Sequence, residues 1–396
     1  SSTDFGHKID AGCLGRNTLG NARRASFVPR CIECRHQRDC VHSLPVHLAG
    51  MNHWNRLWKF GSLLLLAYVI LRGFSTPLQP GLVEAEPNSL SAGTQDISFV
   101  AVGQPFLRPG EGMEAFELIL KSGTALLKTE LTSVEAHRVS ATIEVPTTLP
   151  SPALDAYLFT PSAGTLFLGN AFFVEDAEKG PLPSHLTASI PQESEPHLGF
   201  SFPYQPNIME SIRNLLWHVP MWFAMFFVMG IGFVASLAQL RTGNVNWDHR
   251  AEAAVRTGLV FGILGLITGS LWARWTWGAW WVSDPQLNGA LVTVLLYSGY
   301  MILRAAMGDD DRVGRLSAVY NVFAFVMLVI LLMVLPRYTE SLHPGKDGNP
   351  GFNSYDLDNS LRAVFYPAVI GWGALCYWIY TLRLRMNRIE YRLLTQ

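Results

Sequence analysis

The feature that most constrains this chain is its series of long apolar runs. A helix of about 20 apolar residues can cross a hydrocarbon core roughly 30 Å thick. The chain is also 49% hydrophobic and only 15% charged, whereas soluble proteins are about 25% charged. We therefore predict an α-helical polytopic membrane protein with six transmembrane helices. The first is expected within residues 51–76 and the others near residues 215–239, 255–275, 287–306, 317–336 and 363–382.

The distribution of Lys and Arg predicts how these helices are oriented. Arg56 and Lys59 precede the first helix, and no small-x-small cleavage pattern follows Arg72, so we expect a retained helix with its basic end in the cytoplasm. The loops that follow are then expected to alternate between the outside and the inside of the membrane. Those expected inside hold Arg241, Arg250, Arg256, Arg304, Arg312, Arg315, Arg383, Arg385, Arg388 and Arg392, and those expected outside hold Arg274, Arg337, Lys346 and Arg362. The net charge of −1, without a basic patch, gives no sign of a nucleic-acid partner.

Residues 1–50 differ from the rest of the chain, with scattered arginines and no sustained apolar period. We expect a disordered extension, or a segment translated from upstream of a start at Met51. The alternative is a zinc site, but a zinc ribbon has two CxxC knuckles and this segment has one. The residues that would form it are Cys31, Cys34, Cys40 and either His36 or His42, whereas Cys376, in the last apolar run, is expected to behave as a small hydrophobic residue.

Residues 77–205 are predicted to be an all-β, sandwich-like domain inserted between the first two membrane helices, outside the cytoplasm. Short alternating runs at 97–102, 115–120 and 140–145 are typical of strands, with turn signals between them. This pattern predicts a small antiparallel sandwich or barrel, whose default interpretation is a binding or docking module. Its histidines are expected to be surface residues: His137, His185 and His197.

A stretch of tryptophans lies at residues 277–284, between two of the apolar runs. Together with Trp272 and Trp275, it places five of the 12 tryptophans within ten residues. If the stretch is helical, its large groups recur at i, i+3, i+4 and i+7 and share one face; they are Trp277, Trp280, Trp281 and Asp284. Such a face suits a large flat apolar ligand. The alternatives are an aromatic belt at the membrane surface and, for Asp284 before Pro285, a helix cap.

Two histidines flank this stretch in the sequence. His218 lies at the predicted outer end of the second membrane helix, and His343 lies in the outer loop after the fifth. Each alone would more often be a polar anchor. Because the predicted topology places both on the same membrane face as the tryptophans, they could hold a haem iron as two opposed imidazole ligands. Arg274, Arg337 and Lys346 are candidates for meeting the haem propionates.

These residues carry a resemblance to a known family. The combination of His218-Val-Pro, Ser270-x-Trp272, Trp277-Gly-x-Trp-Trp-x-x-Asp284-x-x-Leu287 and Leu342-His343 resembles the haem-handling CcmC family of bacterial cytochrome c maturation. The resemblance covers residues 51 to about 75 and about 205 to 390. It implies that His218 and His343 are the axial ligands of haem iron. It also implies a haem-contacting platform of Trp277, Gly278, Trp280, Trp281 and Asp284, beside Trp272 and Arg274.

The resemblance further implies a function. Members of this family reside in the bacterial inner membrane and present haem b, a transient cargo, at the periplasmic face to the haem chaperone CcmE. They work beside the transporter subunits CcmA, CcmB and CcmD. This chain has no GxxxxGK[ST] nucleotide motif, so any ATP-driven step would belong to partners. The insert at 77–205 and residues 1–50 have no counterpart in the family.

We therefore predict a non-catalytic haem delivery protein, and two alternatives remain. One is a cytochrome c haem lyase of the same tryptophan-motif superfamily, similar to CcsA, which would attach haem directly to an apocytochrome. Such lyases have more spans and additional histidines. The other is a transport permease without a cofactor, which is disfavoured because the predicted spans contain few charged residues.

Overall fold

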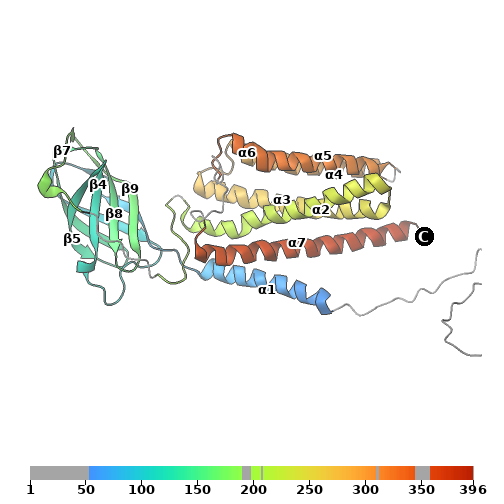
Figure 1. Cartoon of the computed structure of the whole chain (residues 1–396), viewed down its shortest axis with the longest axis horizontal. Helices are drawn as coiled ribbons and strands as arrows, with labels where there is room; N and C mark the ends of the chain where they lie inside the picture. Colours follow the sequence, from blue (N-terminus) through green and yellow to red (C-terminus); the bar gives the residue numbers. More distant parts are fainter. Residues whose placement is uncertain (1–52, 190–197, 207, 309–311, 344–356, 396) are drawn as a thin grey trace, which may run out of the picture. The chain divides into compact units, whose positions relative to one another are not determined.

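The computed structural model describes residues 53–189, 198–206, 208–308, 312–343 and 357–395. The residues from Asn52 to Gln396 form one compact unit of membrane-type helices and a β-rich part (Figure 1). The expectations for residues 1–50, His197 and Lys346 lie outside the described residues.

Six helices among the described residues are long and apolar enough to cross a membrane, as predicted. The two longest continue well beyond their apolar runs. The last one extends through Arg383 and Arg388, because arginine is a good helix former. The helices are α1 (His53–Ser75), α2 (Leu215–Thr242), α3 (Val245–Thr276), α4 (Pro285–Met307), α5 (Val313–Val329) with the short α6 (Leu335–Tyr338), and α7 (Asn359–Leu394).

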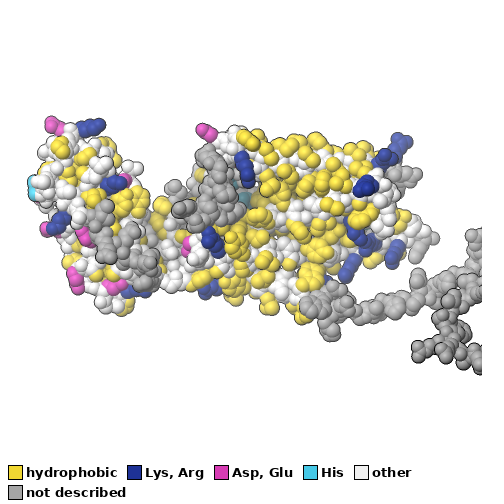
Figure 2. Space-filling view, viewed as in Figure 1, with side chains coloured by type: hydrophobic (Ala, Val, Ile, Leu, Met, Phe, Trp, Pro, Cys, Tyr) yellow, Lys and Arg dark blue, Asp and Glu magenta, His cyan; other side chains and the backbone are white. Residues whose placement is uncertain are grey.

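The surface of the helical part matches a membrane-spanning protein. On the face shown in Figure 2, hydrophobic side chains cover the middle of the bundle, and Lys and Arg gather mainly toward the end where α7 finishes. This is the pattern expected when basic residues stay on one side of a membrane. Placement of the chain in a membrane, and the side on which each loop lies, remain proposals that these features support.

Helix α2 packs closely on α3 because one face of α3 is made of glycines. A Cβ atom added at any of them would lie between 2.6 and 2.9 Å from an α2 side chain. Small residues at such a contact let two membrane helices approach. The pairs, in sequence order along α3, are Gly258 with Met229, Gly262 with Met225, Gly265 with Trp222 and Gly269 with His218.

Helix α5 does not continue regularly into α6. A π-helical turn, Ile330–Val334, separates them. Pro336, two residues after this turn, lacks a backbone N–H and cannot complete the regular helical ladder. The backbone of Leu331 comes so close to α4 that a Cβ at Gly289 would lie 2.7 Å from its carbonyl oxygen. The π turn thus sets the path of the chain that leads to His343.

The β-rich part contains eight strands in one sheet, in the order β1-β3-β6-β5-β4-β8-β9-β2, and a separate pair, β7 and β10. Pairings are antiparallel except β2–β9 and β7–β10. The strands are β1 (Gly81–Glu86), β2 (Ser89–Leu90), β3 (Gly93–Val102), β4 (Glu117–Ser122), β5 (Ala125–Val134), β6 (Arg138–Val145), β7 (Thr148–Leu149), β8 (Ala153–Thr160), β9 (Gly164–Val174) and β10 (Glu178–Lys179). Short 3₁₀ turns lie at Met113–Ala115, Ser184–Leu186 and Met209–Asn214.

The all-β prediction for the insert is confirmed, but the sandwich-like arrangement is replaced by one nearly closed sheet. Strand β5 pairs with β4 through its first half and with β6 through its second. The sheet therefore turns at β5, and its two ends approach one another where β1 lies against β9. A sheet that curls in this way removes most of its exposed edge.

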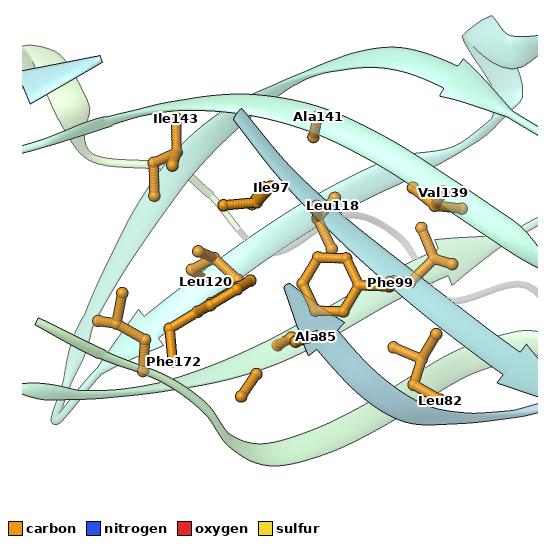
Figure 3. Packing of buried hydrophobic residues seen from close by; sticks show 14 of the residues in the cluster. Leu82, Ala85, Ile97, Phe99, Leu118, Leu120, Val139, Ala141, Ile143 and Phe172 are labelled. Carbon is orange, nitrogen blue, oxygen red and sulfur yellow. The ribbon is translucent and has the colours of Figure 1, made fainter. Parts of the chain in front are cut away.

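The inside of this sheet is filled with apolar side chains from alternate strand positions. In β6, for example, Val139, Ala141 and Ile143 point inward and are buried. Figure 3 shows these side chains with Phe99 and Phe172, whose rings meet edge to face with centroids 5.3 Å apart. The sheet is therefore held by a packed core of its own.

The two chain segments that connect the β-rich part to the helices are bound to each other. Backbone hydrogen bonds link Phe202 to Pro77 and Gln79, at 2.9 and 2.8 Å. Arg213, just before α2, donates to the carbonyl oxygens of Gly73 and Thr76 at 2.5 and 2.7 Å. The entry and exit of the insert thus lie side by side.

Candidate functional site

His218 lies in the first turns of α2 and is held through one ring nitrogen. Its Nδ1 is 3.1 Å from the carbonyl oxygen of Gly265 and 3.2 Å from Thr268 Oγ1, both on α3. Because a carbonyl oxygen only accepts hydrogen bonds, the first contact requires the proton on Nδ1. Nε2 then carries a free lone pair, as in a metal-ligating imidazole.

Two tryptophan rings meet the His218 ring edge to face. Trp272, on α3, has its ring centroid 5.9 Å away, and Trp222, one turn along α2, is 6.4 Å away. The Trp272 indole N–H also donates to Ser211 Oγ at 3.2 Å, which fixes that ring. Trp222 was missed in the sequence, although its i+4 spacing from His218 on one helix could have indicated it.

The tryptophan stretch is not a helix, so the shared face that a helical stretch would give is not formed. Helix α3 ends at Thr276, residues 277–284 form bends and extended chain, and α4 begins at Pro285. The reason is Gly278, whose φ of +76° lies in the left-handed region and ends the helix. Arg274 donates to the carbonyl oxygen of Gly278 at 2.8 Å and stabilises this turn.

The tryptophans of this region divide into two groups. Trp277 lies against His343, with ring centroids 5.3 Å apart in an edge-to-face arrangement, as Trp272 does against His218. The others are exposed. Trp275 is 75% exposed, Trp280 59% and Trp281 38%. Trp272 and Trp277 therefore contact the histidines, and the three exposed indole rings remain available to a ligand, a lipid or a partner.

Asp284 caps helix α4, as the helix-cap interpretation of the sequence predicted. Its Oδ1 accepts from the backbone N–H groups of Gln286 and Leu287 at 2.8 and 3.2 Å. The side chain is only 1% exposed. Its second oxygen, Oδ2, accepts from the backbone N–H of Leu342 at 2.7 Å. The carboxylate therefore also contacts the loop that carries His343, a contact that no sequence pattern indicated.

These contacts control the charge of Asp284. Burial alone would raise the pKa of its carboxyl, but hydrogen bonds from Leu342, Ser341 and Leu287 outweigh burial and lower the pKa below its ordinary value. The group is thus ionised at neutral pH. It supplies a fixed negative charge beside His343.

His343 faces this carboxylate through Nδ1, which lies 3.4 Å from Asp284 Oδ1. At this distance the charge attracts the Nδ1 proton, but the contact is too long for a good hydrogen bond. Burial lowers the pKa of His343, and the neighbouring Asp284 raises it by less, so the net shift is downward. The imidazole is therefore neutral at pH 7. His343 also lies near enough to His218 for the two rings to interact electrostatically.

The remaining predicted cations are less closely bound to the site. Arg274 is exposed and uses one N–H for Gly278, and Arg337 is exposed near the end of α6. Within the described ranges, no group of three or more His, Cys, Asp or Glu residues could hold a bare metal ion. A porphyrin-bound iron needs only one or two protein ligands, because four come from the macrocycle.

Comparison with known proteins places these residues in a family. The model of CcmC, described as Heme exporter protein C, matches residues 197–395, which include every predicted site residue. A Heme exporter protein C from Bradyrhizobium diazoefficiens is 32% identical over 146 residues, covering 37% of this chain and 56% of the relative. The chain thus spans little more than half of that relative's length. Another, from Rhodobacter capsulatus, is 28% identical over 192 residues, covering 47% and 77%.

A relative with a different name matches a shorter part. The Cytochrome c biogenesis protein CcsA of Prochlorococcus marinus is 32% identical over 112 residues, 26% of this chain and 36% of that protein. The family model does not reach the strands of the insert, β1 to β10, which precede residue 197.

Proposed function

This chain belongs to the Heme exporter protein C (CcmC) family, and on that basis we propose that it binds haem between His218 and His343 and delivers it for cytochrome c maturation. The observation that carries the proposal is the way the two imidazoles are held. Nδ1 of His218 is held by the Gly265 carbonyl oxygen at 3.1 Å, and Nδ1 of His343 faces the Asp284 carboxylate at 3.4 Å, longer than a good hydrogen bond. Each leaves Nε2 for an iron atom.

The tryptophans give this pair of ligands an apolar setting. Trp272 and Trp277 each lie against one of the histidines, and a haem between the imidazoles would extend its flat body over the neighbouring indoles. Gly278, with its positive φ, ends α3 directly after Trp277, the residue that packs against His343. We assign Trp280 and Trp281 to the exposed side of the platform, and Arg274 to a haem propionate.

Haem is the cargo here, and the protein's own residues hold and release it without chemistry on the macrocycle. The exposed tryptophans Trp275, Trp280 and Trp281 leave one side open for a haem chaperone of the CcmE type. We place this face in the periplasm and the basic ends of the helices in the cytoplasm of a bacterial inner membrane, following the positive-inside rule. Partners of the CcmA, CcmB and CcmD type would supply any ATP-driven step.

The insert is proposed to dock a partner. It has a packed core of its own, and its two connecting segments are joined beside the start of α2. His218 follows this junction by only a few residues. A partner bound to the insert would therefore be held by a part of the chain that leads directly into the proposed haem ligand.

Haem content of the purified protein tests the ligand assignment. His218→Ala and His343→Ala should each reduce the haem retained per protein, and the double variant should retain little. His185→Ala in the β-rich part is the control, because this histidine is exposed and lies outside the matched region. If the double variant retains as much haem as the control, the ligand assignment is wrong.

The similarity to CcsA supports a second candidate, direct attachment of haem to an apocytochrome. Co-expression with an apocytochrome bearing a CxxCH motif, in cells without a haem chaperone, separates the two. Covalent attachment under those conditions would favour the lyase. Attachment that requires the chaperone would favour delivery.

A further inference from the structure

Asp284 joins two parts of the chain that lie almost 60 positions apart. Its Oδ1 caps the first turn of α4 through Gln286 and Leu287, and its Oδ2 binds the backbone N–H of Leu342. Leu342 directly precedes His343, whose Nδ1 faces the same carboxylate at 3.4 Å. One side chain thus holds both the end of the tryptophan stretch and the loop of a proposed ligand.

A helix cap alone does not account for this residue. Asn, Ser and Thr cap helices about as well as Asp, because a cap needs one acceptor oxygen. Asp284 uses both of its oxygens as acceptors, Oδ1 for the α4 cap and Oδ2 for Leu342. An asparagine would keep the cap through Oδ1 but would present an NH₂ group to the Leu342 N–H, where two donors would face each other. The second contact therefore requires a carboxylate.

Asp284 anchors the described part of this loop, residues 341–343, through the Leu342 N–H and through a hydrogen bond from Ser341. Leu342 itself is exposed, and the backbone N–H of His343 has only a 3.2 Å contact with Ser341 Oγ. The buried carboxylate sets the position of the Leu342 backbone and places a negative charge beside Nδ1. With the Nδ1 proton drawn toward Asp284, Nε2 is left as the basic nitrogen.

We propose that Asp284 is the positioning residue for His343: it ties the 341–343 loop to the start of α4 and orients the imidazole so that Nε2 faces the haem iron. This inference rests on the proposed haem-binding function. Asp284 would act through His343 without touching the iron. Its loss should remove His343 as a ligand while His218 stays bound.

Asp284→Asn tests this directly, because it keeps the α4 cap and removes the contact with Leu342. We expect the haem affinity to fall roughly 10- to 100-fold, the usual effect of losing a group that orients a ligand. The haem that remains should change from six-coordinate low-spin to five-coordinate high-spin. Added imidazole should restore the six-coordinate spectrum, because it can fill a position from which His343 has withdrawn. His343→Gly should show the same rescue.

Asp358→Asn is the matched control. Asp358 caps α7 through a 2.7 Å hydrogen bond from the Leu361 N–H, so the substitution makes the same chemical change at another helix cap. It should leave the haem spectrum and affinity unchanged.

Three results would count against the inference. A wild-type protein without a bis-imidazole spectrum would overturn the proposed function and this inference with it. A normal wild-type spectrum that Asp284→Asn leaves unchanged, in affinity and in spin state, would overturn only the role of Asp284. So would a loss of haem that imidazole restores in His343→Gly but not in Asp284→Asn, because Asp284 would then serve to fold α4.

Discussion

At the scale of single residues, the position of His218 depends on the absence of a side chain opposite it. A Cβ atom at Gly269 would lie 2.6 Å from His218 Cε1. Such a distance forces either the ring or the helix to move, and the ring would lose its contact with the Gly265 carbonyl oxygen. Gly269 is therefore as much a determinant of the site as the histidine it faces.

Gly269→Ala should lower the amount of haem retained by at least tenfold, because even a shift of about 1 Å impairs a preorganised site. Haem quantification in the purified variant measures this. Gly373→Ala in α7 is the control, since no atom lies within 4 Å of a Cβ there. Removing a helical glycine in open space should leave the protein equally stable or up to about 1 kcal/mol more stable.

The lowered pKa values of His343 and Asp284 predict how stability depends on pH. The folded His343 binds its proton less readily than the unfolded chain does, so stability should fall as the pH drops below about 6.5, the ordinary histidine value. Asp284 contributes stability that is present above the ordinary carboxyl pKa and is lost as the pH falls through its lower folded value. Both groups should therefore make the folded protein less stable as the pH falls.

Thermal unfolding of the haem-free protein in detergent should therefore occur at a lower temperature at pH 5 than at pH 7. His343→Phe should show a smaller difference between these two pH values, because it removes one group whose protonation favours the unfolded chain. An equal difference in the variant and the wild type would show that His343 does not contribute to it.

At the scale of helices, a buried ion cluster joins α3 to α4 at the ends away from the histidines. Arg304 binds Asp248 through two hydrogen bonds of 2.7 and 2.9 Å, and Glu252 lies 3.5 Å from it. The Arg304 side chain is 13% exposed and that of Asp248 9%. Removing one partner of a buried pair leaves the other charge uncompensated.

Arg304→Met should therefore destabilise the protein by about 3–5 kcal/mol, measured as a loss of thermal stability in detergent. Arg256→Met is the comparison, since its side chain is 42% exposed in the ion pair with Glu252 and such pairs contribute about 0–1 kcal/mol. Similar losses in the two variants would contradict the assignment of the cluster as the main polar link between α3 and α4.

The elements also show which features the sequence could predict. Six helices were predictable because apolar length alone determines a membrane span, and the α4 cap was predictable from Asp284 before Pro285. The path of residues 277–284 was not, because the period of the large side chains suits a helix and the left-handed Gly278 ends it. The His218–Gly265 contact depends on how α2 and α3 pack, and the Asp284–Leu342 contact on how α4 and the 341–343 loop come together. No local pattern carries that information.

At the scale of the whole molecule, the insert should be separable from the haem site. Gln79 and Phe202 are joined by a 2.8 Å backbone hydrogen bond, so a short turn could replace everything between them. Such a deletion should leave the six helices and the haem spectrum unchanged, because the core of the insert contains only its own residues.

The same deletion should reduce co-purification of the haem chaperone, if the insert docks it. Pull-down of a tagged chaperone from cells that express either form measures this. Substituting the exposed Phe167 and Phe173 of β9 gives a milder second comparison, because the fold of the insert is kept. Unchanged co-purification after the deletion would remove the docking role.

The central claim is that two protein imidazoles bind one haem, and the optical spectrum of the purified protein tests it most directly. The account predicts a six-coordinate, low-spin, bis-imidazole spectrum in the wild type. It predicts a five-coordinate spectrum in each single His→Ala variant, and little bound haem in the double variant. A bis-imidazole spectrum that persists in the double variant His218→Ala/His343→Ala would contradict it.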